Sequence, residues 1–258
     1  MFAQTWRVQW VNYNIYFLLP AVVWIIYILD RALDNQTSKG ERSKVSSRHL
    51  FHHQHWKWLR LFTALLFGFC IAIVLQLPIA IFAHAIPVLG LVFIYYFLAL
   101  FSGGTTKEPH IGKNLIAGLT FSYGVALGIF FFRPSSFWFD LLLKTPEMWF
   151  FAGLCACNIT AIDIWEASRA SAEKEIKGYY GFTLTVPLLI LTFISLHYAI
   201  NGDEYARPFY FAIMIAAGLL QIVNRFRSRF SLDALRVMAD AALIVPAPIF
   251  WVYMQYLR

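Results

Sequence analysis

Long apolar stretches separated by polar segments run through the whole chain. Each stretch is close to the roughly 20 residues that a helix needs to cross a bilayer. The stretches lack the alternation typical of barrel strands, and backbone groups in lipid must be paired within the protein. The pattern predicts an all-α, polytopic transmembrane helical bundle in one domain of residues 1–258, with eight spans at 13–30, 58–77, 79–101, 114–133, 147–164, 180–200, 207–226 and 232–254.

The composition of the chain agrees with this prediction. Of its 258 residues, 60% are hydrophobic and only 14% are charged, and the mean hydropathy is +0.61. Such values are typical of integral membrane proteins. The net charge is +7, but the basic residues lie in the segments between spans rather than on one folded face. We therefore expect membrane lipid, and not nucleic acid, as a partner.

The basic residues are divided unevenly between the two predicted sides of the membrane. Most of the 21 Lys and Arg residues lie in 31–60, 102–113, 165–179 and 225–236. Because cytoplasmic loops of membrane proteins are enriched in Lys and Arg, we expect these segments in the cytoplasm and both termini outside. The loop 31–57 is the longest of them and too polar for a simple turn. We expect it to lie over the mouth of a functional site.

Two acidic pairs stand at the predicted cytoplasmic ends of spans. Asp30 and Asp34 are four residues apart, and Asp163 and Glu166 are three apart, so each pair shares a helix face. Mg²⁺ is commonly bound by one or two carboxylates together with phosphate oxygens. The four acids are therefore candidate metal ligands and catalytic residues. Basic residues on the same side are candidates for binding a diphosphate: Arg31, Arg48, Lys113, Arg169 and Lys174.

The first acidic pair resembles a motif of the UbiA-type intramembrane prenyltransferases. That motif reads Asn-Asp-x-x-Asp-x-x-x-Asp, and Asp30 and Asp34 match its second and third aspartates. Ile26 and Tyr27 stand where the family has Asn and the first Asp, so one acid of the first metal site is absent.

The second acidic pair resembles the other motif of this family, Asp-x-x-x-Asp. Asp163 matches its first aspartate and Ala167 takes the place of its second, for which Glu166 is a candidate substitute. Arg48 and Lys113 are similar to basic residues of the family, and Asn158, deeper on the same helix, is a candidate to contact diphosphate or acceptor.

The resemblance covers about residues 13–226 and implies both a fold and an activity. The fold is a helical bundle whose two motifs bind Mg²⁺ and a prenyl diphosphate at cytoplasmic helix ends. The activity is transfer of the polyprenyl group to an apolar or aromatic acceptor. The alternative is a UbiA-like membrane protein whose altered site binds isoprenoid, lipid or a protein partner without catalysis. Catalysis requires the acidic residues to converge on one cavity, whereas the alternative predicts that they meet basic side chains.

Two further patterns suggest other functions. Arg236 and Asp240 are spaced for an ion pair within one helix, and a transporter built around them would need a polar path across the membrane. His49-x-x-His52-His53 reproduces one box of membrane di-iron enzymes. Those enzymes carry several such boxes, while the other histidines here are isolated. We interpret the 49–55 cluster as a loop-packing or headgroup feature.

Overall fold

The apolar segments form long helices in the computed structural model, which describes residues 1–37, 55–101, 110–133, 142–170 and 174–257. Within these ranges eight segments are long and apolar enough to cross a membrane. The protein is thus an all-helical, multi-pass membrane protein. The helices are α1 (Phe2–Thr5), α2 (Tyr13–Thr37), α4 (Trp56–Val74), α5 (Ala80–Phe101), α6 (Ile111–Phe130), α8 (Pro146–Ala170), α9 (Lys174–Asn201), α10 (Arg207–Arg225), η2 (Arg227–Arg229), α11 (Leu232–Ile244) and α12 (Pro246–Tyr256).

The last span differs from the prediction of one continuous helix over 232–254. It consists of α11 and α12, which are separated at Val245. Pro246 and Pro248 follow this residue and have no backbone N–H to donate to the preceding turn, so the helical hydrogen bonding is interrupted there. The other spans begin and end within a few residues of the predicted positions. Helix α2 continues to Thr37, so residues 31–37 of the predicted loop 31–57 are helical, and residues 38–54 of that loop lie outside the described residues.

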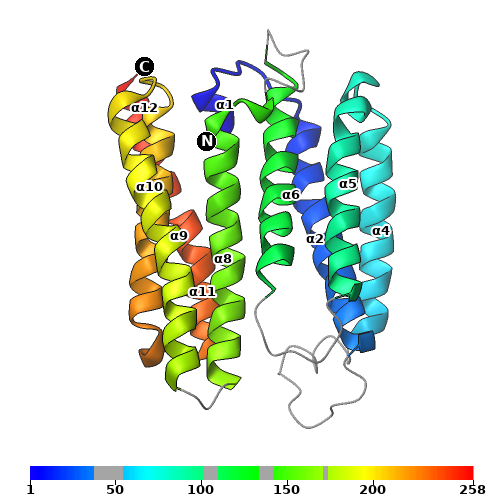
Figure 1. Ribbon diagram of the computed structural model, residues 1–258. Coiled ribbons are helices and arrows are strands. Elements are labelled where there is room, and N and C mark those ends of the chain that lie inside the picture. Colours follow the sequence, from blue (N-terminus) through cyan, green and yellow to red (C-terminus); the bar gives the residue numbers. More distant parts are fainter. Residues whose placement is uncertain (38–54, 102–109, 134–141, 171–173, 258) are drawn as a thin grey trace.

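Helices α6 and α8 run side by side through the middle of the molecule (Figure 1). A Cβ atom on Gly118 of α6 would lie 2.6 Å from the backbone nitrogen of Ala156 and 2.8 Å from the carbonyl oxygen of Ala152, both on α8. Small residues at a helix interface let the backbones approach closely in membrane proteins. We call this contact of Gly118 with Ala152 and Ala156 the α6–α8 seam.

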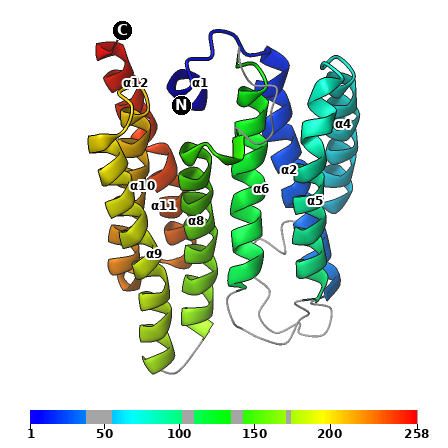
Figure 2. The same cartoon turned by 45° about the horizontal axis from the view of Figure 1, so that its top comes forward.

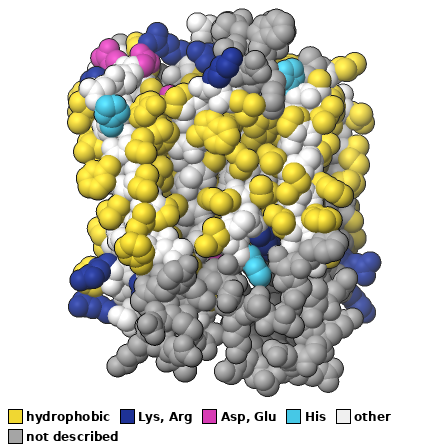
Figure 3. All heavy atoms as spheres, viewed as in Figure 1, with side chains coloured by type: hydrophobic (Ala, Val, Ile, Leu, Met, Phe, Trp, Pro, Cys, Tyr) yellow, Lys and Arg dark blue, Asp and Glu magenta, His cyan; other side chains and the backbone are white. Residues whose placement is uncertain are grey.

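The other helices form two groups on either side of the seam. Helix α2 contacts α4 and α6, and α5 contacts α6, whereas α9 to α12 gather around α8 and α10 (Figures 1 and 2). Most side chains of α4 are exposed, and among the described side chains of α5 only Ile81 is buried. Figure 3 shows hydrophobic side chains over the middle of the molecule and Lys and Arg toward its two ends. This is the distribution expected of a surface that faces lipid.

We name the two ends of the bundle after one residue each. The Lys113 end is where α6 begins and α8 ends, and the Glu147 end is where α8 begins. Both chain termini lie at the Glu147 end (Figures 1 and 2). The chain ends therefore share one side of the bundle, as predicted, while the assignment of that side to the outside stays a prediction.

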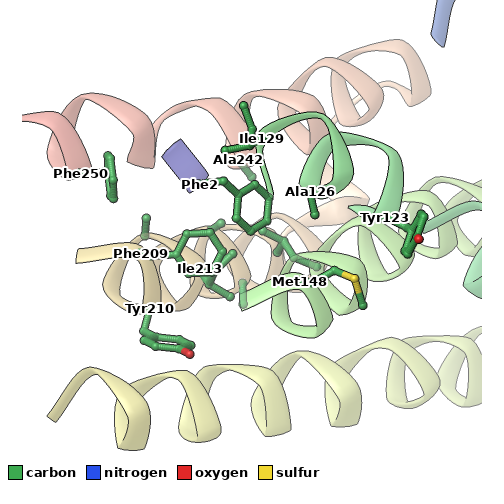
Figure 4. Packing of buried hydrophobic residues seen from close by; sticks show 14 of the residues in the cluster. Phe2, Tyr123, Ala126, Ile129, Met148, Phe209, Tyr210, Ile213, Ala242 and Phe250 are labelled. Carbon is green, nitrogen blue, oxygen red and sulfur yellow. The ribbon is translucent and has the colours of Figure 1, made fainter. Parts of the chain in front are cut away.

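An aromatic cluster closes the Glu147 end. The centroid of the Phe2 ring lies 5.2 Å from that of Phe209 (Figure 4). It lies 4.6 Å from the centroid of the Trp6 ring. The buried carboxylate of Glu147 accepts hydrogen bonds from the Tyr210 hydroxyl at 2.9 Å and the Trp6 indole N–H at 3.4 Å. Its position in the first turn of α8 is favourable, because the helix dipole is positive there.

Candidate functional site

The first turn of α6 stands between the two acidic helices at the Lys113 end. Lys113 and Asn114 are consecutive, and their side chains reach toward different neighbours. The Lys113 ammonium lies 3.2 Å from Asp30 Oδ1 of α2, and the Asn114 amide donates to Asp163 Oδ2 of α8 at 2.8 Å. Two carboxylates that are far apart in the sequence are thus attached to one helix turn.

Asp30 has a second partner, Tyr95, which the sequence pattern does not indicate. The Tyr95 hydroxyl of α5 donates to Asp30 Oδ1 at 2.8 Å, and the Lys113 ammonium lies 5.0 Å from the centre of the Tyr95 ring. The side chains of Lys113 and Asp30 are only 18% and 14% exposed. Because the pair is largely withdrawn from water, its attraction is weakly screened.

Asp163 lies on the other side of the same turn. Its partner Asn114 is buried, and Lys113, His110 and Glu166 are its titratable neighbours. Asp30, Tyr95, Lys113, Asn114 and Asp163 together form a group that we call the polar mouth. Asn114 and Tyr95 carried no sequence signal of their own, although Asn114 directly follows a candidate residue.

Glu166 points toward α11 rather than into the polar mouth. Arg236 donates to Glu166 Oε1 through Nε at 3.0 Å and through a second, shorter contact, and to Asp233 at 2.7 Å. The predicted Arg236 to Asp240 ion pair is therefore wrong. Long side chains on a helix lean toward its N-terminus, which brings the guanidinium to Asp233 and, across the interface, to Glu166.

Asn158 and Asp240 meet farther from the Lys113 end. Asn158 donates to Asp240 Oδ1 at 3.5 Å, which is a long contact. Asn158 is 8% exposed, and its carbonyl oxygen has no hydrogen-bond partner in the described part of the chain. This amide therefore joins α8 to α11 and lies outside the polar mouth.

The remaining predicted residues divide into two kinds. Arg169 donates to the carbonyl oxygen of Phe230 and so ties the end of α8 to the segment before α11. For the other candidates the structure describes no side chain. Only the backbone is described for Arg31 and Asp34 in α2 and for Lys174 in α9. Wholly outside the described residues lie Arg48, His49, His52 and His53.

A resident Mg²⁺ ion would have to use Asp30 and Asp163. Among the described residues no group of three or more His, Cys, Asp and Glu side chains could hold a metal ion, and Glu166 is directed to Arg236 of α11 rather than into the polar mouth. Asp30 and Asp163 each use one carboxylate oxygen in the contacts above. Among the described residues none bonds to the second oxygen of either carboxylate, and a Mg²⁺ that also takes phosphate oxygens needs only one or two protein carboxylates. Both aspartates fit this role.

The chain matches no family model, and neither curated proteins nor solved structures provide a match.

Proposed function

We propose that the polar mouth binds the diphosphate of a prenyl diphosphate and that the protein transfers the prenyl group to an apolar or aromatic acceptor. The observation that carries this proposal is the attachment of Asp30 and Asp163 to adjacent residues of α6. Asp30 and Asp163 are two of the three aspartates that match the UbiA-type motifs, one from each motif, so a UbiA-like arrangement of the bundle is part of the proposal. The Lys113 end then faces the cytoplasm, in keeping with its Lys and Arg residues.

Each residue of the polar mouth has a role in this proposal. The Lys113 ammonium and the Asn114 amide can exchange their hydrogen bonds to the aspartates for hydrogen bonds to phosphate oxygens, since charge-assisted hydrogen bonds to phosphate are strong. Asp30 and Asp163 would hold Mg²⁺, which supplies positive charge to a departing diphosphate. The Tyr95 hydroxyl keeps Asp30 in place when Lys113 turns to the substrate.

The transfer itself is a substitution at the first carbon of the prenyl chain. The bond from this carbon to the diphosphate oxygen breaks, and its electron pair leaves with the pyrophosphate. A carbon or oxygen atom of the acceptor supplies the pair for the new bond and then loses its proton. Lys113 stabilises the negative charge that develops on the leaving oxygen. The apolar surroundings of the spans exclude water from the allylic cation.

Binding without transfer is the second candidate, and two ion pairs favour it. Lys113 neutralises Asp30, and Arg236 neutralises Glu166, so two of the four predicted ligands meet basic side chains. A transport path beside Asp240 is less favoured, because the core between it and the Glu147 end is built from apolar residues such as Ala242, Met148 and Phe250.

Binding of geranylgeranyl diphosphate to the detergent-purified full chain tests the proposal, with and without Mg²⁺. We expect Mg²⁺-dependent binding in the wild type and a loss of at least tenfold in Asp30→Asn and in Asp163→Asn, since each removes charge from the site. Asp203→Asn is the matched control, because Asp203 is an exposed aspartate near Arg7 at the Glu147 end. It should bind like the wild type.

Two other outcomes have distinct meanings. Binding that does not depend on Mg²⁺ and is unchanged by both substitutions would reject the proposed prenyltransferase function. Mg²⁺-dependent binding without release of pyrophosphate, across a screen of phenolic acceptors, would favour the candidate that binds without transfer.

A further inference from the structure

Arginine and phenylalanine alternate where α10 ends. Residues 225–230 read Arg-Phe-Arg-Ser-Arg-Phe and comprise the last residue of α10, the turn η2 and the residues that flank it. We call this segment the basic turn. It contains no acid, and Asp233, the next acid along the chain, pairs with Arg236. The basic turn therefore brings uncompensated positive charge to the Lys113 end, outside the polar mouth.

Contacts with α8, α9 and α10 hold the basic turn in place. Arg227 Nη1 donates to the side-chain oxygen of the buried Asn224 of α10 at 3.2 Å. A Cβ atom on Gly181 of α9 would lie 2.9 Å from Arg227 Nη2, so the guanidinium lies directly against that helix. Arg169 of α8 donates to the carbonyl oxygen of Phe230. A ligand of this turn would meet a backbone that is already ordered, which lowers the entropy lost on binding.

An apolar hollow of about 210 Å³ adjoins the basic turn. It is lined by Ile222, Val223, Phe226, Arg229, Phe230 and Met238. Ile222 is 55% exposed, so the hollow is open to the surface of the bundle. It lies beside the end of the span Arg207–Arg225, where acyl chains and headgroups of a membrane meet. Hydrocarbon from the surrounding lipid can therefore enter it.

Arg229 connects this hollow with the charge of the basic turn. Its guanidinium carbon lies 4.8 Å from the centre of the Phe226 ring, which is a cation–π distance, and its side chain is exposed. Within the described ranges no carboxylate forms an ion pair with Arg229 or Arg225. A guanidinium offers a planar fork of donors that matches phosphate. The site thus combines a donor for phosphate with a hollow for an apolar chain.

We infer that the hollow binds one acyl chain of an anionic phospholipid whose phosphate lies at Arg229. Basic pockets between membrane helices are known sites for anionic headgroups. A zwitterionic phospholipid carries a cation beside its phosphate, which the arginines of the basic turn would repel. A free phosphate ion would leave the hollow unused. Because Met238 belongs to α11, the bound lipid bridges α10 and α11. The inference does not depend on the proposed prenyl transfer.

Native mass spectrometry of the detergent-purified full chain tests the charge preference with two lipids of equal acyl chains. Dioleoylphosphatidylglycerol is anionic, and dioleoylphosphatidylcholine is zwitterionic. We expect the wild type to bind the anionic lipid more tightly, and Arg229→Gln to lose about fivefold in affinity for it, the contribution of one basic residue at an anionic lipid. The matched control is Arg60→Gln, since Arg60 is an exposed arginine of α4 in the other group of helices. It should bind like the wild type.

A second pair of variants tests the hollow. Ile222→Trp fills it and should weaken binding of dioleoylphosphatidylglycerol. Ile190→Trp, on α9, is the control, because Ile190 is 53% exposed and does not line the hollow. Thermal unfolding of both variants checks that they are folded, as expected for substitutions of exposed side chains.

Three outcomes would overturn the inference. Equal binding of the two lipids by the wild type would remove the charge preference, and equal losses in Arg229→Gln and Arg60→Gln would show only a general attraction to basic residues. Displacement of the lipid by glycerol 3-phosphate, which has the phosphate but no acyl chain, would show a site for free phosphate esters instead.

Discussion

At the residue scale, the acids are fixed in position by partners from other helices. Asp30 could be recognised in the sequence because it forms an acidic pair with Asp34 at the end of an apolar run and matches a known motif. Its partners Tyr95 and Lys113 come from α5 and α6, and no local spacing indicates them. Arg236 shows the same limit, because the spacing within α11 pointed to Asp240 while packing against α8 supplied Glu166. Ionisable residues are visible in sequence, but their pairing depends on helix packing.

The Lys113 and Asp30 pair leads to a stability prediction. Lys113→Met should lower the free energy of unfolding by about 3 kcal/mol, because it leaves a largely buried carboxylate unpaired. The double variant Lys113→Met with Asp30→Asn should recover much of this loss, since neither charge remains. Denaturant unfolding in mixed micelles measures both. A double variant as unstable as the single one would show that the lysine stem, and not its charge, stabilises this end.

At the element scale, the positions of the spans could be predicted from the sequence, but which spans pack against each other could not. Hydropathy located the spans to within a few residues, because the bilayer sets both their length and their polarity. It could not indicate that α6 and α8 form the centre while α4 and α5 stay at the periphery, since both kinds of helix are apolar. The signal for the centre lies in small residues, Gly118 against Ala152 and Ala156, which is weak in a chain that holds many such residues.

The seam can be tested with a single methyl group. Gly118→Ala should destabilise the protein by about 1–3 kcal/mol, because the added Cβ would meet backbone atoms that cannot yield without moving a helix. Gly124→Ala is the matched control on the same helix, as no heavy atom lies within 4 Å of its added Cβ. It should be neutral or gain up to about 1 kcal/mol from helix propensity. Equal effects in the two variants would contradict the close approach.

At the scale of the whole molecule, the candidate chemistry is gathered at one end and the chain termini at the other. The polar mouth and the pair of Glu166 with Arg236 lie toward the Lys113 end, and the aromatic cluster with Glu147 closes the opposite end. The distribution of Lys and Arg separates the same two ends in the sequence, because loops on one side of a membrane are enriched in basic residues. Which end faces the cytoplasm stays a prediction.

Cysteine labelling in intact cells of an expression host tests the orientation. In a background with Cys70, Cys155 and Cys157 replaced by Ala, Glu204→Cys should react with a membrane-impermeant maleimide, because residue 204 is exposed at the Glu147 end. Ser228→Cys, exposed in η2 at the Lys113 end, should react only after permeabilisation. The reverse pattern would invert the topology and place the polar mouth outside.

The α6–α8 seam also bears on how the chain is made. Its two helices are neighbours in the sequence, so they can pair while α9 to α12 are still being synthesised. Arg236 lies in α11 and pairs with Glu166 near the polar mouth. Of the residues in the described polar contacts at this end, it leaves the ribosome last. Until then Glu166 has water or lipid headgroups as neighbours. Biogenesis therefore completes the centre of the bundle first and the pair of Glu166 with Arg236 last, so a chain that stops before α11 has a formed seam and an unpaired acid.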